Sequence, residues 1–293
     1  MALMQMSTAV SLTLLLWLSN DLHTIPVSEA SRILAIETIA GKSHWNFMSS
    51  VLRSLVDAGH TVTVFTPFLD GDRENYTEVD TSSDFPMKLD LDAMHMVQNF
   101  RNPFALVKVL SGLTRFYCDV VHGNRKLIDL LASGIRDRYD LLLVEPPLSF
   151  DCFSYIADAL GLPVIYLIPS PMVTFTERLF TGHLSNPSYV SNIFASHAVP
   201  NTFIQRFTNT ALLAYSIVRT RYDWLATRLM DAKPYDLAPT INPSIIFQNS
   251  HYVTESPRPL TPNVVYIGGI HLKPAKTIPK DILDFIEDSP HGV

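Results

Sequence analysis

The fold is decided by residues 32–66, which read RILAIETIAGKSHWNFMSSVLRSLVDAGHTVTVFT. The first part, 32–37, is an apolar run that ends in turn residues, as is typical of a buried parallel strand. From about His44 onward apolar residues recur at helical spacing, and Ser43 is the expected N-cap of that helix. Residues 61–66 then predict a second, β-branched strand. Strand, helix and strand in this order define a βαβ unit with a right-handed crossover.

The same alternation continues along the chain. Helices are predicted at about 123–133 and 151–160, and strands at 140–144, 163–168, 244–248 and 263–267. The predicted fold class is therefore α/β, with a doubly wound Rossmann-like parallel sheet. Between 180 and 233 the pattern breaks, and a proline-bracketed loop leads into a long aromatic-rich helix at 203–230. An insertion of this kind either covers a pocket or is a peripheral helix, and the sequence leaves both open.

Composition narrows the class of protein. Of 293 residues 47% are hydrophobic and 17% are charged, which predicts a large buried core and excludes a disordered chain. The net charge is -6 and Lys and Arg do not cluster, so we expect no nucleic-acid partner. Two cysteines, Cys118 and Cys152, are too few for a framework of several disulfides. A single bridge between them is possible, but we expect two separate buried thiols.

The first thirty residues differ from the rest of the chain. Val10 to Leu18 is an apolar run of signal-peptide length, and Ser28-Glu29-Ala30 has small residues where a cleavage site needs them. We expect residues 1–30 to be a signal peptide and the chain to enter the secretory pathway. The Asn-Tyr-Thr sequence at Asn75 is then a predicted glycosylation site. After signal cleavage no later segment predicts a membrane span.

The loop after the first strand carries the first candidate for chemistry. A glycine-rich dinucleotide fingerprint and a phosphate-binding loop are both missing there, and His44 stands in the first turn of the helix instead. Ligands bind at the carboxyl ends of the strands in such sheets. A helix N-terminus disfavours the imidazolium form, so we expect a neutral His44 that can accept a proton. A structural role beside a capping serine explains a lone histidine equally well.

A histidine base needs a carboxylate on its other ring nitrogen. Glu145 lies at the end of the predicted 140–144 strand, and Asp151 opens the helix that follows. Asp151 is also explained as an N-cap, and Glu145 as the partner of a basic residue. From the residues alone the choice between the two acids stays open.

The segment 249–276 holds the most specific local pattern. Gly268 and Gly269 follow a predicted strand and predict a turn with positive φ and close backbone approach. His271 is interpreted as a turn residue, because no second His or Cys lies nearby at zinc spacing. We predict no metal site and no bound cofactor.

Two stretches together resemble one family. Ser43-His44-Trp45 with Gly59-His60-Thr61-Val62-Thr63 is similar to the opening of the UDP-glycosyltransferases of the UDP-glucuronosyltransferase-like type. Pro257-Arg258-Pro259-Leu260 with Val265-Tyr266-Ile267-Gly268-Gly269-Ile270-His271 resembles the stretch just before the interdomain linker of that family. The region 140–152 resembles insect members in particular. The likeness covers essentially the whole chain.

The resemblance implies the N-terminal half of a GT-B glycosyltransferase, a detoxification enzyme of the endoplasmic reticulum. Residues 31–273 are then the acceptor-binding domain and 274–293 begin the interdomain linker. His44 is implied as the base that deprotonates a hydroxyl of a small lipophilic acceptor, which attacks a UDP-sugar with inversion. An acid supports the histidine, and between Asp151 and Glu145 we favour Asp151.

The sequence departs from the family in one large respect. The donor-binding half, which holds the UDP-sugar co-substrate, and the membrane anchor of the family do not occur in it. We therefore expect a fragment that is inactive alone, since transfer needs both halves around the reacting atoms. The alternative is a non-catalytic secretory protein that binds lipophilic molecules or associates with full-length relatives. Acceptor, sugar and oligomeric state are not encoded in any motif.

Overall fold

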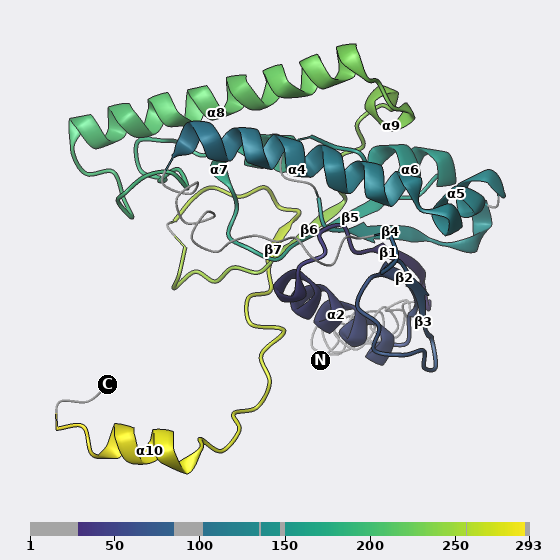
Figure 1. Cartoon of the computed structure of the whole chain (residues 1–293), viewed down its shortest axis with the longest axis horizontal. Helices are drawn as coiled ribbons and strands as arrows, with labels where there is room; N and C mark the ends of the chain where they lie inside the picture. The colour runs from purple at the N-terminus through teal and green to yellow at the C-terminus, as the bar shows by residue number, and fades with distance from the viewer. Residues whose placement is uncertain (1–28, 85–101, 135, 147–149, 256, 291–293) are drawn as a thin grey trace, which may run out of the picture.

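A seven-stranded sheet forms the centre of the computed structural model, which describes residues 29–84, 102–134, 136–146, 150–255 and 257–290 (Figure 1). Every strand pairs in parallel with its neighbours, in the order β3-β2-β1-β4-β5-β6-β7. The strands are β1 (Arg32–Ile36), β2 (Thr61–Thr66), β3 (Tyr76–Asp80), β4 (Leu141–Val144), β5 (Val164–Ile168), β6 (Ile245–Gln248) and β7 (Val264–Tyr266). The parallel α/β sheet is as predicted. The predicted signal peptide lies, up to residue 28, outside the described residues.

The helices cover both faces of the sheet, as a doubly wound fold requires. They are α2 (Lys42–Asp57), α4 (Pro103–Gly123), α5 (Arg125–Ala132), the 3-10 turn η1 (Arg136–Arg138), α6 (Ser154–Leu160), α7 (Thr174–Thr181), α8 (Phe203–Met230), α9 (Pro234–Leu237) and α10 (Lys280–Glu287). Figure 1 shows α2 on one side of the sheet and α4, α5 and α6 on the other. α10 buries none of its residues.

The alternation of side chains along β1 explains this two-sided packing. Ile33 and Ala35 join the core cluster of α2, which includes Trp45. Leu34 and Ile36 point the other way and join the cluster of α4, α5 and α6. Successive residues of a strand face opposite sides, so an unbroken apolar run suits a strand covered on both faces.

Several elements were not predicted from the sequence. They are β3, which pairs with β2 at the edge of the sheet, the helices α4, α7 and α9, and the short turn η1. The start of α2 also differs: the helix begins at Lys42 after Gly41, with no side-chain cap. The expectation that Ser43 caps this helix was therefore wrong, because Ser43 already lies inside the first turn.

The insertion after α7 contains the long helix that was predicted at 203–230. Thr202 and Gln205 form a capping box at the start of α8, in which each side chain bonds the other residue's backbone N–H. α8 packs across α4 and α7 and forms the outermost layer (Figure 1). Within the described part of the chain, none of the helices is long and apolar enough to cross a membrane.

The two cysteines are joined. Cys118 of α4 and Cys152, just before α6, form a disulfide across 34 positions of sequence, with Cα atoms 6.1 Å apart. The expectation of two separate thiols was wrong, because α4, which the sequence pattern did not reveal, passes directly over the start of α6. The disulfide ties α4 to the segment just before α6.

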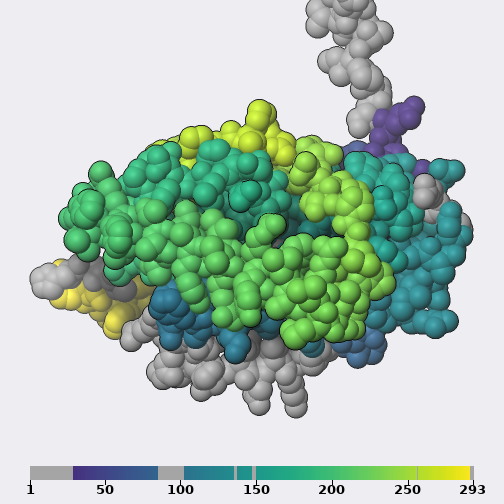
Figure 2. Space-filling model, turned by 90° about the horizontal axis from the view of Figure 1, so that it is seen from above, coloured from purple at the N-terminus to yellow at the C-terminus, as the bar shows by residue number. Residues whose placement is uncertain are grey.

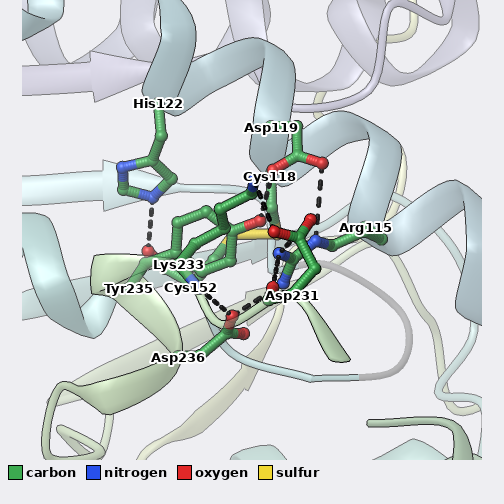
Figure 3. A network of polar contacts seen from close by, with 9 residues as sticks. All are labelled: Arg115, Cys118, Asp119, His122, Cys152, Asp231, Lys233, Tyr235 and Asp236. Atoms are coloured by element: carbon green, nitrogen blue, oxygen red, sulfur yellow. Dashed lines mark hydrogen bonds and ion pairs between the residues drawn. A yellow bond between two sulfur atoms is a disulfide. The ribbon is translucent and has the colours of Figure 1, made fainter. Parts of the chain in front are cut away.

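A polar network surrounds this disulfide (Figure 3). Arg115 of α4 forms an ion pair with the buried carboxylate of Asp236 at 2.7 Å, and the hydroxyl of Tyr235 donates to Asp119 at 2.7 Å. The His122 Nε2 bonds the backbone oxygen of Cys152 at 2.8 Å, and burial above all lowers the pKa of this histidine. These contacts fasten the segment after α8 to α4, which fixes where the insertion returns to the sheet.

Candidate active site

His44 and Glu145 meet at the carboxyl edge of the sheet. β1 and β4 pair in parallel with Ile36 opposite Val144, so the loops after both strands leave the sheet side by side. Glu145 follows β4 directly, and His44 lies in the first turn of α2, after the loop that follows β1. The His44 Nδ1 lies 2.7 Å from the Glu145 Oε1. The histidine side chain is 32% exposed and the glutamate only 6%.

The pair is positioned by the backbone on both sides. The Thr38 hydroxyl donates to the backbone oxygen of Glu145 at 2.8 Å, which ties the two loops together. The Gly41 carbonyl accepts the Trp45 N–H at 2.9 Å and closes the first turn of α2. A carboxylate only accepts hydrogen bonds, so Nδ1 carries the hydrogen in this pair and the neutral ring has its free lone pair on Nε2.

The electrostatics of His44 differ from the expectation. Burial lowers the pKa of the His44 imidazole. The hydrogen bond to Glu145 and the negative charge of that residue together raise the pKa by more than burial lowers it, so the pKa lies above 6.5. The expectation of a neutral ring rested on the helix N-terminus alone, and Glu145 acts on the pKa of His44 in the opposite direction. A raised pKa makes His44 a stronger base than a free histidine.

A second carboxyl group stands beside the pair and was missed by the sequence reasoning. Glu37 follows β1 as Glu145 follows β4, and it is 1% exposed with no hydrogen-bond partner for either oxygen among the described residues. Burial first, and then the charge of Glu145, raise the pKa of Glu37 well above its usual range. Burial also raises the pKa of Glu145, but the hydrogen bond from His44 opposes this. Of the two carboxyl groups, Glu145 is therefore the one whose charged form is stabilised by His44, whereas Glu37 has no such partner among the described residues.

The structure places Asp151 elsewhere. Its Oδ1 accepts the backbone N–H groups of Phe153 at 2.9 Å and Ser154 at 3.1 Å, at the start of α6. These bonds form a local turn that leads into α6, whose N-cap residue is Phe153 and not Asp151 as the sequence also allowed. The carboxylate against His44 belongs to Glu145, so the geometry does not support the preference for Asp151. The reason is position along the chain: Glu145 directly follows the strand next to β1, whereas Asp151 lies further on, in the turn before α6.

Asp151 also lines a hollow of about 290 Å³ beneath α8. Phe175 and Leu179 of α7 and Thr220 and Trp224 of α8 are among its walls. Of the two interpretations of the insertion, this supports the one in which the long helix covers a pocket.

The glycine pair has the predicted geometry. A Cβ on Gly268 would lie 2.6 Å from the backbone oxygen of Ser250, and Gly269 has φ +85. Gly268 thus allows the chain to pass close to the backbone of Ser250, and Gly269 allows the positive φ of the turn. His271 lies in the same turn, as predicted. The His271 ring meets Phe47 of α2 edge to face, with centroids 6.4 Å apart. The turn therefore packs against the helix that carries His44.

The predicted glycosylation site can also be located. Asn75 is exposed, in the turn before β3, with φ 57. No group of three or more His, Cys, Asp or Glu residues suited to a metal ion occurs within the described ranges.

The comparisons with known proteins identify the family. Residues 32–293 match the family model described as "UDP-glucoronosyl and UDP-glucosyl transferase". The chain therefore belongs to the UDP-glycosyltransferase family, and the resemblance inferred from its motifs is confirmed.

Curated relatives agree with this assignment. The chain is 27% identical to UDP-glucosyltransferase 2 of the insect Dactylopius coccus, over 91% of this chain and 52% of the relative. It is 29% identical to UDP-glucuronosyltransferase 2B15 of Rattus norvegicus, over 86% of this chain and 51% of the relative. The chain thus spans about half the length of the curated relatives it matches.

Solved structures of the same class also match at low similarity. One is UGT2 of Phytolacca americana complexed with UDP-2fluoro-glucose and pterostilbene, with a TM-score of 0.44 and 12% identity over 90% of this chain and 58% of that one. The sheet of this chain and its family membership agree with the predicted fold class, half of a GT-B glycosyltransferase.

Proposed function

We propose that this chain supplies the acceptor site and the catalytic base of a UDP-glycosyltransferase. The acceptor hydroxyl gives its proton to the His44 Nε2, and its oxygen forms a bond to the anomeric carbon of a UDP-sugar. The bond from that carbon to the UDP oxygen breaks, and UDP leaves with the electron pair. A single displacement of this kind inverts the anomeric centre. Glu145 stabilises the imidazolium that forms.

The contact of 2.7 Å between His44 and Glu145 is the observation that carries this proposal. It joins a partly exposed base to a buried acid at the sheet edge where ligands bind in such folds. The proposed step consists of one proton transfer and one displacement. The raised pKa of His44 supports its role as base.

We assign acceptor binding to this chain and donor binding to the other half of the enzyme on the basis of chain length. The chain spans about half of its relatives, so we assign residues 31–273 to the acceptor and 274–293 to the start of a linker. The exposure of α10, which buries no residue, supports the linker assignment. The description of the family, "UDP-glucoronosyl and UDP-glucosyl transferase", supports a UDP-sugar as the donor, and we assign a small lipophilic molecule as the acceptor. The donor is held mainly by the other half of such an enzyme.

A transfer assay on this chain tests the division. UDP-glucose and a panel of phenolic acceptors are supplied, and binding of both ligand classes is titrated in parallel. We expect acceptor binding without UDP binding and without transfer, because differential stabilisation needs both halves. Transfer by the chain alone would contradict the assignment of the donor site to the other half. Absence of acceptor binding would contradict the acceptor site itself.

We further propose that the chain matures in the secretory pathway, in the lumen of the endoplasmic reticulum. The Cys118–Cys152 disulfide and the exposed Asn75 support this, since both bridges and N-linked glycans form there. Expression in secretory cells should yield a product whose mass falls on N-glycosidase treatment. The Asn75→Gln variant should lack that shift, and an unchanged shift would place the glycan elsewhere.

A further inference from the structure

The hollow beneath α8 has the size of a small-molecule pocket. Its volume is about 290 Å³, at the lower end of the range for such pockets. α7, α8 and α9 supply much of its wall, together with Phe150 and Asp151, which precede α6. Figure 2, seen from above, shows α8 spread over the near face of the molecule. Among the described residues that line the hollow, neither His44 nor Glu145 occurs, so it is a candidate site outside the catalytic pair.

Aromatic side chains make much of this wall apolar. Phe150 and Phe175 are buried, and Trp224 of α8 is half-buried beside them in the lining. Leu179 of α7 and Ile217 of α8 add aliphatic surface. Aromatic rings pair favourably with other rings, in offset or edge-to-face arrangements. The walls therefore suit a ligand whose body is a planar aromatic ring system.

Two arginines from different helices line the same hollow. Arg178 belongs to α7 and Arg221 to α8, and these two helices pack against each other. Within the described part of the chain, neither side chain forms an ion pair or a hydrogen bond. Arg219 of α8, by contrast, is paired with Asp223 at 2.8 Å. A guanidinium presents its donors in a planar fork that matches a carboxylate, so the two unpaired arginines indicate an anionic group on the ligand.

The two acids that line the hollow already have partners. Asp236 forms an ion pair with Arg115 at 2.7 Å. The Asp151 Oδ1 accepts the N–H groups of Phe153 and Ser154. Their negative charges nevertheless oppose a second charge on the ligand. A carboxylate, with one negative charge, is therefore favoured over a phosphate monoester, which carries about -1.5 to -2.

We propose that the hollow beneath α8 binds a planar aromatic carboxylate, with the ring against Trp224 and the carboxylate between Arg178 and Arg221. This site goes beyond the transfer reaction, because the catalytic pair contributes nothing to its walls. The His44→Ala variant should therefore bind such a ligand as the parent does, whether or not the transfer mechanism proposed above is correct.

Ligands that differ only in charge test the proposal on the full chain. Naphthoate and its neutral amide, naphthamide, have the same ring system and nearly the same shape, and their affinities are compared by isothermal titration calorimetry. We expect naphthoate to bind about tenfold more tightly, because each of two exposed ion pairs contributes a factor of about two to five. Naphthyl phosphate should bind more weakly than naphthoate, because Asp151 and Asp236 oppose its second charge.

Two double variants locate the charge that is recognised. Arg178→Gln with Arg221→Gln should lower the affinity for naphthoate about tenfold, to that of naphthamide, and leave naphthamide binding unchanged. The matched control is Arg125→Gln with Arg206→Gln, which removes the same net charge from exposed arginines that do not line the hollow. This control should keep the preference for naphthoate. Circular dichroism confirms that each variant is folded.

Trp224 gives a second readout, which reports where the ligand binds. Naphthoate in the hollow should change the tryptophan emission, and Trp224→Phe should lose most of this change while calorimetry still detects binding. Several results would overturn the proposal: no binding of naphthoate, equal affinity for naphthoate and naphthamide, or tighter binding of the phosphate. A preference that survives the Arg178 and Arg221 replacements, or an emission change that survives Trp224→Phe, would place the ligand elsewhere and overturn it as well.

Discussion

Replacing His44 by alanine is expected to lower turnover by about two to four orders of magnitude, the usual contribution of a general base. The proton of the acceptor hydroxyl then has no positioned acceptor at the sheet edge. Acceptor affinity should change little, because the ring contributes mainly to the transition state. The measurement is steady-state kinetics on residues 31–293 joined to the donor half of a relative such as the Dactylopius coccus enzyme.

Two comparisons make this result specific. The variant His60→Ala removes another histidine near the same βαβ unit, whose Nδ1 accepts the Ser31 N–H at 3.1 Å, and should leave turnover near that of the parent. The raised pKa of His44 predicts that kcat/KM of the parent rises with pH as the ring loses its proton, with a midpoint above 6.5. Near-normal turnover of His44→Ala would return this histidine to a structural role.

Replacing Glu145 by glutamine is expected to lower turnover by about a hundredfold or more, approaching the effect of His44→Ala. The amide keeps the size of the side chain but removes the charge that stabilises the imidazolium. The pH profile gives a second signature. Burial lowers the pKa of His44 and Glu145 raises it, so without the charge the lowering effect remains. The acid limb of kcat/KM should therefore move to lower pH.

The matched variant is Asp151→Asn, which distinguishes the two acids. Asparagine can accept the same backbone bonds from Phe153 and Ser154, so turnover should stay within about twofold of the parent and the acid limb should not move. If Asp151→Asn shifts the profile and Glu145→Gln does not, the assignment made from the geometry is wrong. A loss of activity in both with no shift in either would indicate structural roles for both acids.

The fold could be predicted largely because its strands are strong local signals. Runs such as Leu141–Val144 are apolar throughout, and a parallel strand covered on both faces needs this pattern. β3 (YTEVD) could not be found in this way, because it lies at the sheet edge and only Tyr76 is buried. α4 could not be found either, since its apolar residues serve both the sheet and α8, which blurs the helical repeat.

The candidate site was predictable only in part. His44 follows from its place after the first strand, and Gly268 and Gly269 from turn chemistry, because both depend on neighbours in sequence. Glu37 has the same sequence pattern as Glu145, because each is an acid that directly follows a buried strand. The burial of the Glu37 side chain, however, could not be inferred from the sequence. The Cys118–Cys152 pairing depended on α4 crossing the start of α6, a contact between segments far apart in sequence.

The family, the parallel α/β architecture and the histidine at the sheet edge could be predicted from local patterns, because periodicity, turn residues and motifs are encoded in neighbouring residues. That Glu145 and not Asp151 lies 2.7 Å from His44 could be seen only in the folded chain. The same holds for Arg178 and Arg221, which line one hollow beneath α8. Both depend on the register between strands and on which face of a helix meets the core. These are set by contacts across the whole chain, and a single stretch of sequence does not contain them.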